Sequence, residues 1–173
     1  MTGGRGRLGP VDTLWAGWRS RYVRSADEWN EAGCLFCRLP DEDDAAAFIL
    51  ERGVLGFSVL NRFPYTTGHL MVSQYRHVAD LTDLTAAEVE EIWRLMARAR
   101  RACGEALKPD GFNLGANLGR VAGAGVPDHL HFHLVPRWAG DTSFVTTVGE
   151  TRVIPEDLAM TWRLLREALA GAQ

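Results

Sequence analysis

The stretch Asp128-His-Leu-His-Phe-His-Leu-Val-Pro-Arg137 places three histidines two residues apart, with apolar residues between them. Successive side chains of a β-strand point to opposite faces of its sheet. We therefore expect His129, His131 and His133 to line one face, while the intervening apolar residues enter the core. The pattern predicts a half-buried strand that carries three imidazoles side by side.

A glycine-rich loop, Gly119-Arg-Val-Ala-Gly-Ala-Gly125, lies directly upstream of this strand. Glycine and alanine allow main-chain N–H groups to approach an anion closely, which makes Gly123, Ala124 and Gly125 candidate phosphate contacts. A plain flexible turn is the alternative interpretation of the same residues. Imidazole nucleophiles beside a phosphate-binding loop indicate phosphoryl or nucleotidyl transfer.

Length and composition restrict the classes of protein that this chain can represent. A chain of 173 residues is expected to form one domain. Its net charge of −3 argues against a protein that binds nucleic acid by bulk electrostatics. It has neither an apolar run of about 18 residues nor a secretory signal, so we expect no membrane association. Three cysteines, an odd number, do not suggest a disulfide framework, and a cytoplasmic location fits best.

The remaining segments predict an α+β domain. Residues 1–10 are expected to be a disordered tail, followed by a short helix with Trp15, Trp18 and Tyr22 on one side. The acidic run 41–44 is interpreted as a solvated loop. Strands are predicted over residues 47–51, 54–61, 69–74, 112–118 and 129–135, the first two joined by a hairpin at Arg52-Gly53.

Two long helices complete this predicted architecture. Thr85-Ala-Ala-Glu88 has the form of a capping box, and the helix it opens is expected to end at Lys108. Its apolar side is predicted to consist of Val89, Ile92, Trp93, Met96 and Cys103. A final helix from Pro155 carries an apolar stripe of Leu158, Trp162, Leu165 and Leu169. The prediction is one antiparallel five-stranded sheet over residues 11–173, with a long helix between strands and a C-terminal helix.

These residues resemble the histidine triad (HIT) family, whose mark is three histidines alternating with apolar residues. His129-Leu-His-Phe-His-Leu-Val135 fits that mark at every position. The segment 60–72 resembles the family's nucleoside-binding hairpin, and residues 113–117 with the glycine loop resemble its phosphate side. The starts and ends of the matching region, 14–19 and 135–141, are similar to the bacterial diadenosine-polyphosphate phosphorylase/hydrolase branch.

The resemblance implies an enzyme with a covalent intermediate. His131 would be the nucleophile, its second ring nitrogen held by a backbone carbonyl, and His133 would contact the phosphate oxygens. His69 would lie near the nucleophile, although a satisfied core histidine is equally compatible with the sequence. Asn61 would contact the ribose and Asn117 would donate on the phosphate side. An asparagine that stabilises a turn is the alternative at position 61.

The resemblance also implies a structural zinc ion. On its own, Cys34-Leu-Phe-Cys37 is compatible with a redox pair or with two buried small residues. The ligands of zinc-bearing HIT proteins map onto Cys34, Cys37, His77 and His129, a closed set of four nitrogen and sulfur donors. His129 would then be committed to metal and unable to serve as the nucleophile.

Several functional alternatives remain at this point. The leading hypothesis is a homodimeric enzyme that cleaves dinucleoside polyphosphates or related adenosine phosphates at the α-phosphate, with water or orthophosphate as the acceptor. The alternatives are a nucleoside phosphoramidate hydrolase and a non-catalytic nucleotide-binding protein. Three histidines facing solvent, or three gathered around one catalytic zinc ion, would contradict the assignment.

Overall fold

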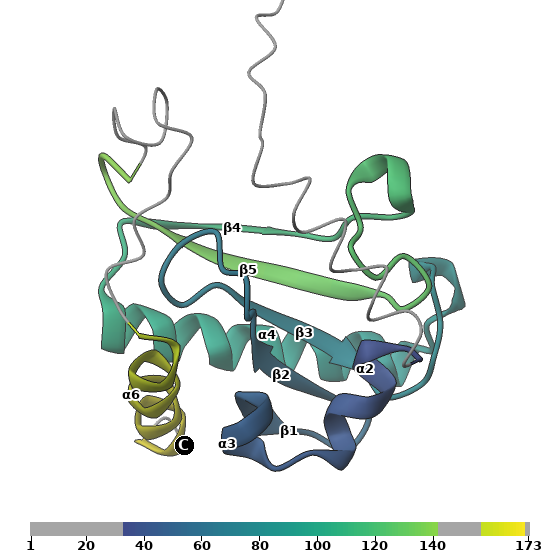
Figure 1. Cartoon of the computed structure of the whole chain (residues 1–173), viewed down its shortest axis with the longest axis horizontal. Helices are drawn as coiled ribbons and strands as arrows, with labels where there is room; N and C mark the ends of the chain where they lie inside the picture. Colours follow the sequence, from purple (N-terminus) through teal and green to yellow (C-terminus); the bar gives the residue numbers. More distant parts are fainter. Residues whose placement is uncertain (1–32, 142–156, 172–173) are drawn as a thin grey trace, which may run out of the picture.

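The computed structural model describes residues 33–141 and 157–171 (Figure 1), and the predicted tail 1–10 and aromatic helix around Trp15 lie outside these residues. An antiparallel five-stranded sheet has the order β1-β2-β3-β5-β4. Its strands are β1 (Ile49–Arg52), β2 (Gly56–Leu60), β3 (Leu70–Gln74), β4 (Gly111–Gly115) and β5 (His131–Arg137). The predicted α+β sheet with a long helix between strands and a C-terminal helix is confirmed.

Helices and 3-10 turns connect the strands and cover the sheet. They are α2 (Leu35–Arg38), η1 (Leu39–Asp41), α3 (Asp44–Ala47), η2 (Leu81–Asp83), α4 (Ala86–Leu107), η3 (Arg120–Ala122) and α6 (Leu158–Gly171). In Figure 1, α4 runs along one side of the sheet, whereas α2 lies on the other. The two sides of the sheet therefore have different partners.

Alternation along the strands divides the buried residues into two cores. Leu70 and Val72 of β3 join the core that α4 and α6 complete. Met71, between them, joins a smaller core with Phe36 of α2 and Phe57 of β2. The period of two in strand side chains produces this division. The second core matters for function because the histidines of β5 lie on the same side of the sheet as Met71.

Several strand boundaries differ from the sequence prediction, among them both ends of β2. Ala47 ends α3 instead of opening β1, because Asp43 caps α3 through Ala45 N and Ala46 N, so the acidic run is not a plain loop. Strand β4 ends at Gly115, before the glycine loop begins. Strand β5 begins at His131 and continues through Pro136. Proline is tolerated there because the pairing with β3 stops at Leu134 and only β4 pairs beyond it.

The predicted apolar side of α4 is partly wrong. Ile92, Met96 and Cys103 are buried as expected, but Val89 is 50% exposed and Trp93 is 64% exposed. At 100° per residue, the buried stripe of α4 centres near Ile92, Ala99 and Cys103, and the two exposed residues are rotated away from it. On α6, the predicted stripe is confirmed, with Leu165 and Leu169 buried and Leu158 and Trp162 packed against the same core.

The capping box at the start of α4 includes an ion pair. Thr85 Oγ1 accepts from Glu88 N, and the Glu88 carboxylate accepts from Thr85 N. Arg76 donates to both carboxylate oxygens of Glu88, at 3.0 and 2.7 Å. These donors, first of all Arg76, lower the pKa of Glu88 to about 2 although burial opposes them. The ion pair thus joins the segment after β3 to the first turn of α4.

This ion pair predicts acid sensitivity. Because the pKa of Glu88 is lower in the folded chain, its stabilising effect is complete above about pH 4.5 and disappears as the pH falls toward 2. Arg76 is half exposed, so we expect about 1–2 kcal/mol of unfolding free energy, less than the pKa shift alone implies. Urea unfolding at pH 7 and at pH 3 measures this contribution to the free energy of unfolding. The Glu88→Gln variant should lose less stability between these pH values than the parent protein, and equal losses would refute the assignment.

Each helix within residues 33–141 and 157–171 is too short or too polar to cross a membrane.

Candidate active site and metal-binding cluster

Strand β5 presents His131 and His133 on the side of the sheet that faces α2. Register places Ser73 opposite His131 and Met71 opposite His133. The two imidazoles meet edge to face with their centroids 5.0 Å apart. Burial lowers the pKa of His131, and burial together with the neighbouring His131 lowers that of His133 to about 4. Both rings are therefore neutral near pH 7.

A main-chain carbonyl fixes the tautomer of His131. Its Nδ1 lies 2.8 Å from the carbonyl oxygen of His129. A carbonyl oxygen only accepts, so Nδ1 carries the proton and Nε2 of the neutral ring carries the lone pair. The predicted hydrogen bond from His131 to a backbone carbonyl is confirmed. The arrangement leaves Nε2 as a nucleophilic atom on a ring whose other nitrogen is held.

A second chain of hydrogen bonds fixes His133. Tyr65 N donates to His69 Nδ1 at 3.0 Å, so His69 Nε2 carries the proton. His69 Nε2 lies 2.9 Å from His133 Nδ1 and donates to it. The proton of neutral His133 is consequently on Nε2. The predicted candidate His69 therefore lies beside His133. The Tyr65 ring is tilted against the His69 ring, with the centroids 4.4 Å apart.

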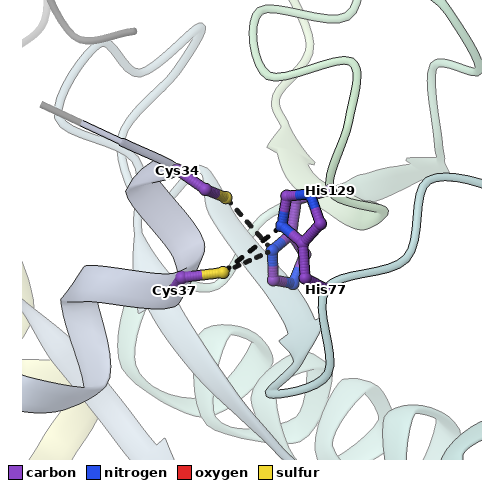
Figure 2. Close-up of side chains that lie close together, drawn as sticks. All are labelled: Cys34, Cys37, His77 and His129. Carbon is purple, nitrogen blue, oxygen red and sulfur yellow. Dashed lines mark hydrogen bonds between the residues drawn. The ribbon is translucent and has the colours of Figure 1, made fainter. Parts of the chain in front are cut away.

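A cluster of possible metal ligands lies beside the triad and consists of Cys34, Cys37, His77 and His129 (Figure 2). One donor atom from each residue lies within 4.8 Å of the donor atoms of the other three. Cys34 Sγ is 3.2 Å from His129 Nδ1, and Cys37 Sγ is 3.3 Å from His77 Nδ1. Cys34 is the N-cap of α2 and Cys37 lies within that helix, whereas His129 lies two residues before the start of β5. All four predicted metal ligands come together, and the cluster could hold a metal ion.

The donor atoms fit a tetrahedral ion. Metal–sulfur and metal–nitrogen bonds of about 2.3 and 2.0 Å place neighbouring S and N ligands about 3.5 Å apart. The distances of 3.2, 3.3 and 3.5 Å between Sγ and Nδ1 atoms match this edge. His129 Nε2 lies 3.0 Å from the carbonyl oxygen of Gln74 and donates to it, which turns the Nδ1 lone pair toward the sulfurs. Without a cation, burial and then Cys34 raise the pKa of Cys37 to about 11.

A pocket opens between α2 and the sheet beside His131. Its apolar wall includes Phe36, Leu39, Val59 and Met71, and Asn61 and His131 contribute polar atoms. Asn61 is 7% exposed, and its amide is oriented because Oδ1 accepts from Phe63 N while Nδ2 lies 3.4 Å from His69 Nδ1. A mostly apolar pocket with a few fixed polar groups suits a nucleoside-sized ligand.

The glycine loop folds partly on itself. Gly123 N donates to Arg120 O, and Ala124 N donates to Gly119 O. Asn117 Nδ2 donates to the Gly123 carbonyl at 3.4 Å. Of the predicted phosphate contacts, Gly125 is the one that lines the pocket together with His131.

Three features of the site were missed from the sequence. Phe36 is stacked on His131 with a centroid distance of 4.6 Å, and its position between the two cysteines was the available signal. The carbonyl of Gln74 orients His129, and no side-chain pattern reveals such a contact. Tyr65 orients His69, and its place four residues before that histidine was the only signal.

Comparisons with known proteins identify the family. Residues 44–140 match the profile of the HIT domain. An AP-4-A phosphorylase from Mycobacterium tuberculosis is 39% identical over 168 residues, which cover 94% of this chain and 86% of that protein. The chain therefore belongs to the HIT family of histidine triad proteins.

Two further relatives are similar to this chain. A Zn-bound histidine triad family protein from Mycobacterium smegmatis superimposes with a TM-score of 0.67 at 34% identity, covering 82% of this chain and 96% of that one. An adenosine 5'-monophosphoramidase from Schizosaccharomyces pombe is 30% identical over 104 residues, 60% of this chain and 74% of that protein.

Proposed function

We propose that this HIT protein is a nucleotidyl-transferring enzyme that cleaves dinucleoside polyphosphates, or related adenosine phosphates, at the α-phosphate. The observation that carries the proposal is the pair of fixed tautomers. His131 offers an Nε2 lone pair, and His133 offers an Nε2–H donor beside it. The likeness to an AP-4-A phosphorylase over 94% of the chain supports the substrate class.

The first half of the reaction forms a nucleotidyl-histidine. His131 Nε2 attacks the α-phosphorus, the P–N bond forms, and the P–O bond to the leaving phosphate breaks, with its electron pair going to that oxygen. The ring becomes cationic, and the carbonyl of His129 accepts a stronger hydrogen bond from Nδ1–H as the charge develops. The Nε2–H of His133 stabilises the charge on the phosphate oxygens, and His69 holds its orientation.

The second half restores the enzyme. An oxygen of water or orthophosphate attacks the same phosphorus, the P–N bond breaks, and its electron pair returns to His131 Nε2. The acceptor loses its proton to solvent or to a neighbouring phosphate oxygen, and the product is the nucleoside monophosphate or diphosphate, respectively. The apolar wall of the pocket supports a nucleobase site, with Asn61 toward the ribose and Gly125 toward the phosphate.

The cluster of Cys34, Cys37, His77 and His129 is proposed to hold a structural Zn²⁺ ion. Four protein donors close a tetrahedral site without an open position for substrate. The ion would supply stability to the segment around α2, and the chemical steps proceed on His131. The likeness to a Zn-bound relative supports zinc over other metals.

Substrate trials test the proposal. With diadenosine tetraphosphate, ADP and ATP that appear in equal amounts only when orthophosphate is present demonstrate phosphorolysis, and AMP and ATP formed without orthophosphate demonstrate hydrolysis at the α-phosphate. An adenosine phosphoramidate is the second substrate, because the Schizosaccharomyces pombe relative favours that activity as the alternative. Calorimetric binding of AMP without turnover of either substrate would instead support a non-catalytic nucleotide-binding protein.

A homodimer is also proposed, and β4 is the edge on which it would form. Within the described residues, β4 pairs on one side only, and Leu114 on it is 46% exposed. Open strand edges pair readily with a second copy. Sedimentation should give about twice the 19.2 kDa of one chain, and Leu114→Lys should shift the protein toward the monomer. A monomeric parent protein at micromolar concentration would exclude the dimer.

A further inference from the structure

We infer that Phe36 is a positioning residue for His131. The segment Cys34–Cys37, which carries two of the proposed metal ligands, holds Phe36 in place. This inference rests on the proposed nucleotidyl transfer and adds a link between the metal cluster and the reacting nitrogen. Phe36 lies between Cys34 and Cys37 in the sequence and is 1% exposed. The position of the Phe36 ring therefore depends on the positions of Cys34 and Cys37.

Two rings enclose the imidazole of His131. Phe36 is stacked on it, with centroids 4.6 Å apart and planes inclined by 27°. His133 meets it edge to face at 5.0 Å and 73°. A histidine ring turns about a broad terminal torsion, so one hydrogen bond from Nδ1 does not fix its plane. The stacked ring removes that remaining freedom.

The metal cluster and His131 are connected by two further contacts. Phe36 also approaches the ring of His129, with centroids 5.4 Å apart. The carbonyl that accepts from His131 Nδ1 belongs to the same His129. An ion that fixes Cys34, Cys37 and His129 thereby fixes both the stacking partner and the hydrogen-bond acceptor of His131. In-line attack requires this alignment, because small misplacements of a nucleophile cost large factors in rate.

Phe36 also lines the pocket, so its effect on substrate binding must be separated from its effect on the nucleophile. Leu39 provides the matched control, since it lines the same pocket, belongs to the same apolar core and is 5% exposed. Leu39 lies two residues after Cys37, outside the segment between the two cysteines, and it has no ring that could stack on His131. Phe36→Leu removes the stacked ring but retains an apolar side chain, and Leu39→Ala trims the pocket wall alone.

The experiment compares metal-loaded Phe36→Leu with metal-loaded Leu39→Ala. Phe36→Leu is expected to lower kcat at least about tenfold, whereas Leu39→Ala should act mainly on KM. The nitrogen-bound proton of His131 Nδ1, followed by NMR in labelled protein without substrate, should exchange faster with water in Phe36→Leu only. Metal content should equal that of the parent protein in both variants.

Two outcomes would overturn the inference. If Phe36→Leu changes KM alone, or if the Nδ1 proton is as protected as in the parent protein, Phe36 is only a wall of the pocket. The NMR arm does not depend on turnover. A protein that cleaves no tested substrate but shows the selective exchange change would contradict the proposed function and leave the positioning role standing.

Discussion

The His131→Ala variant is expected to lose turnover by about 10⁴-fold or more, because the proposed mechanism forms the P–N bond at Nε2 of this residue. His133 cannot replace it, since the contact with His69 commits its Nδ1 lone pair. The variant should still bind AMP, because the apolar wall of the pocket is unaltered. Steady-state assays with diadenosine tetraphosphate measure turnover, and calorimetry measures the binding of AMP.

Ser73→Ala is the matched control for this variant. Ser73 lies opposite His131 in the sheet, is fully buried and donates to the carbonyl of Leu130. The substitution disturbs the same region but removes no group that takes part in the proposed reaction. Turnover should therefore stay within about tenfold of the parent protein. Wild-type turnover in His131→Ala would show that the reaction does not pass through this residue.

Removal of the metal ligands is expected to have the largest effect on stability. The double variant Cys34→Ala, Cys37→Ala should bind no zinc and lose about 3–5 kcal/mol of unfolding free energy, because structural zinc contributes directly to folding. Elemental analysis and urea unfolding measure the two quantities. Turnover should fall as well, since the cysteines hold Phe36 against His131.

Cys103→Ala is the corresponding control. This third cysteine is buried on α4 in the larger core, away from the cluster. Its substitution should cost about 1–2 kcal/mol through lost packing and leave the zinc content unchanged. Parent protein purified without chelator that carries well under one zinc ion per chain would reject the structural zinc.

The alternation of residues 129–135 is why the site could be predicted from sequence. A period of two forces His131 and His133 to one face whatever the rest of the sheet does. The capping box at Thr85 likewise depends on local contacts alone, and it formed as predicted. The four metal ligands could be mapped only through the family resemblance, because their positions span 95 residues of the chain.

What could not be predicted depends on contacts between imidazole nitrogens and main-chain groups. The tautomer of His129 is fixed by the carbonyl of Gln74, and that of His69 by the N–H of Tyr65. Backbone atoms are the same in every residue, so residue types alone do not predict which backbone group each ring contacts. The exposure of Trp93 was missed for another reason, since its rotation on α4 depends on where the sheet contacts the helix.

The most direct measurement is to trap the covalent intermediate. Rapid quenching of the enzyme with diadenosine tetraphosphate, followed by digestion and mass spectrometry, should find an adenylyl group on the peptide that contains His131, with fragmentation assigning it to that residue. The group should be lost on incubation with water or orthophosphate and absent from His131→Ala. An adenylyl group on His129 or His133, or product formation in single turnover without any protein-bound nucleotide, would contradict this account.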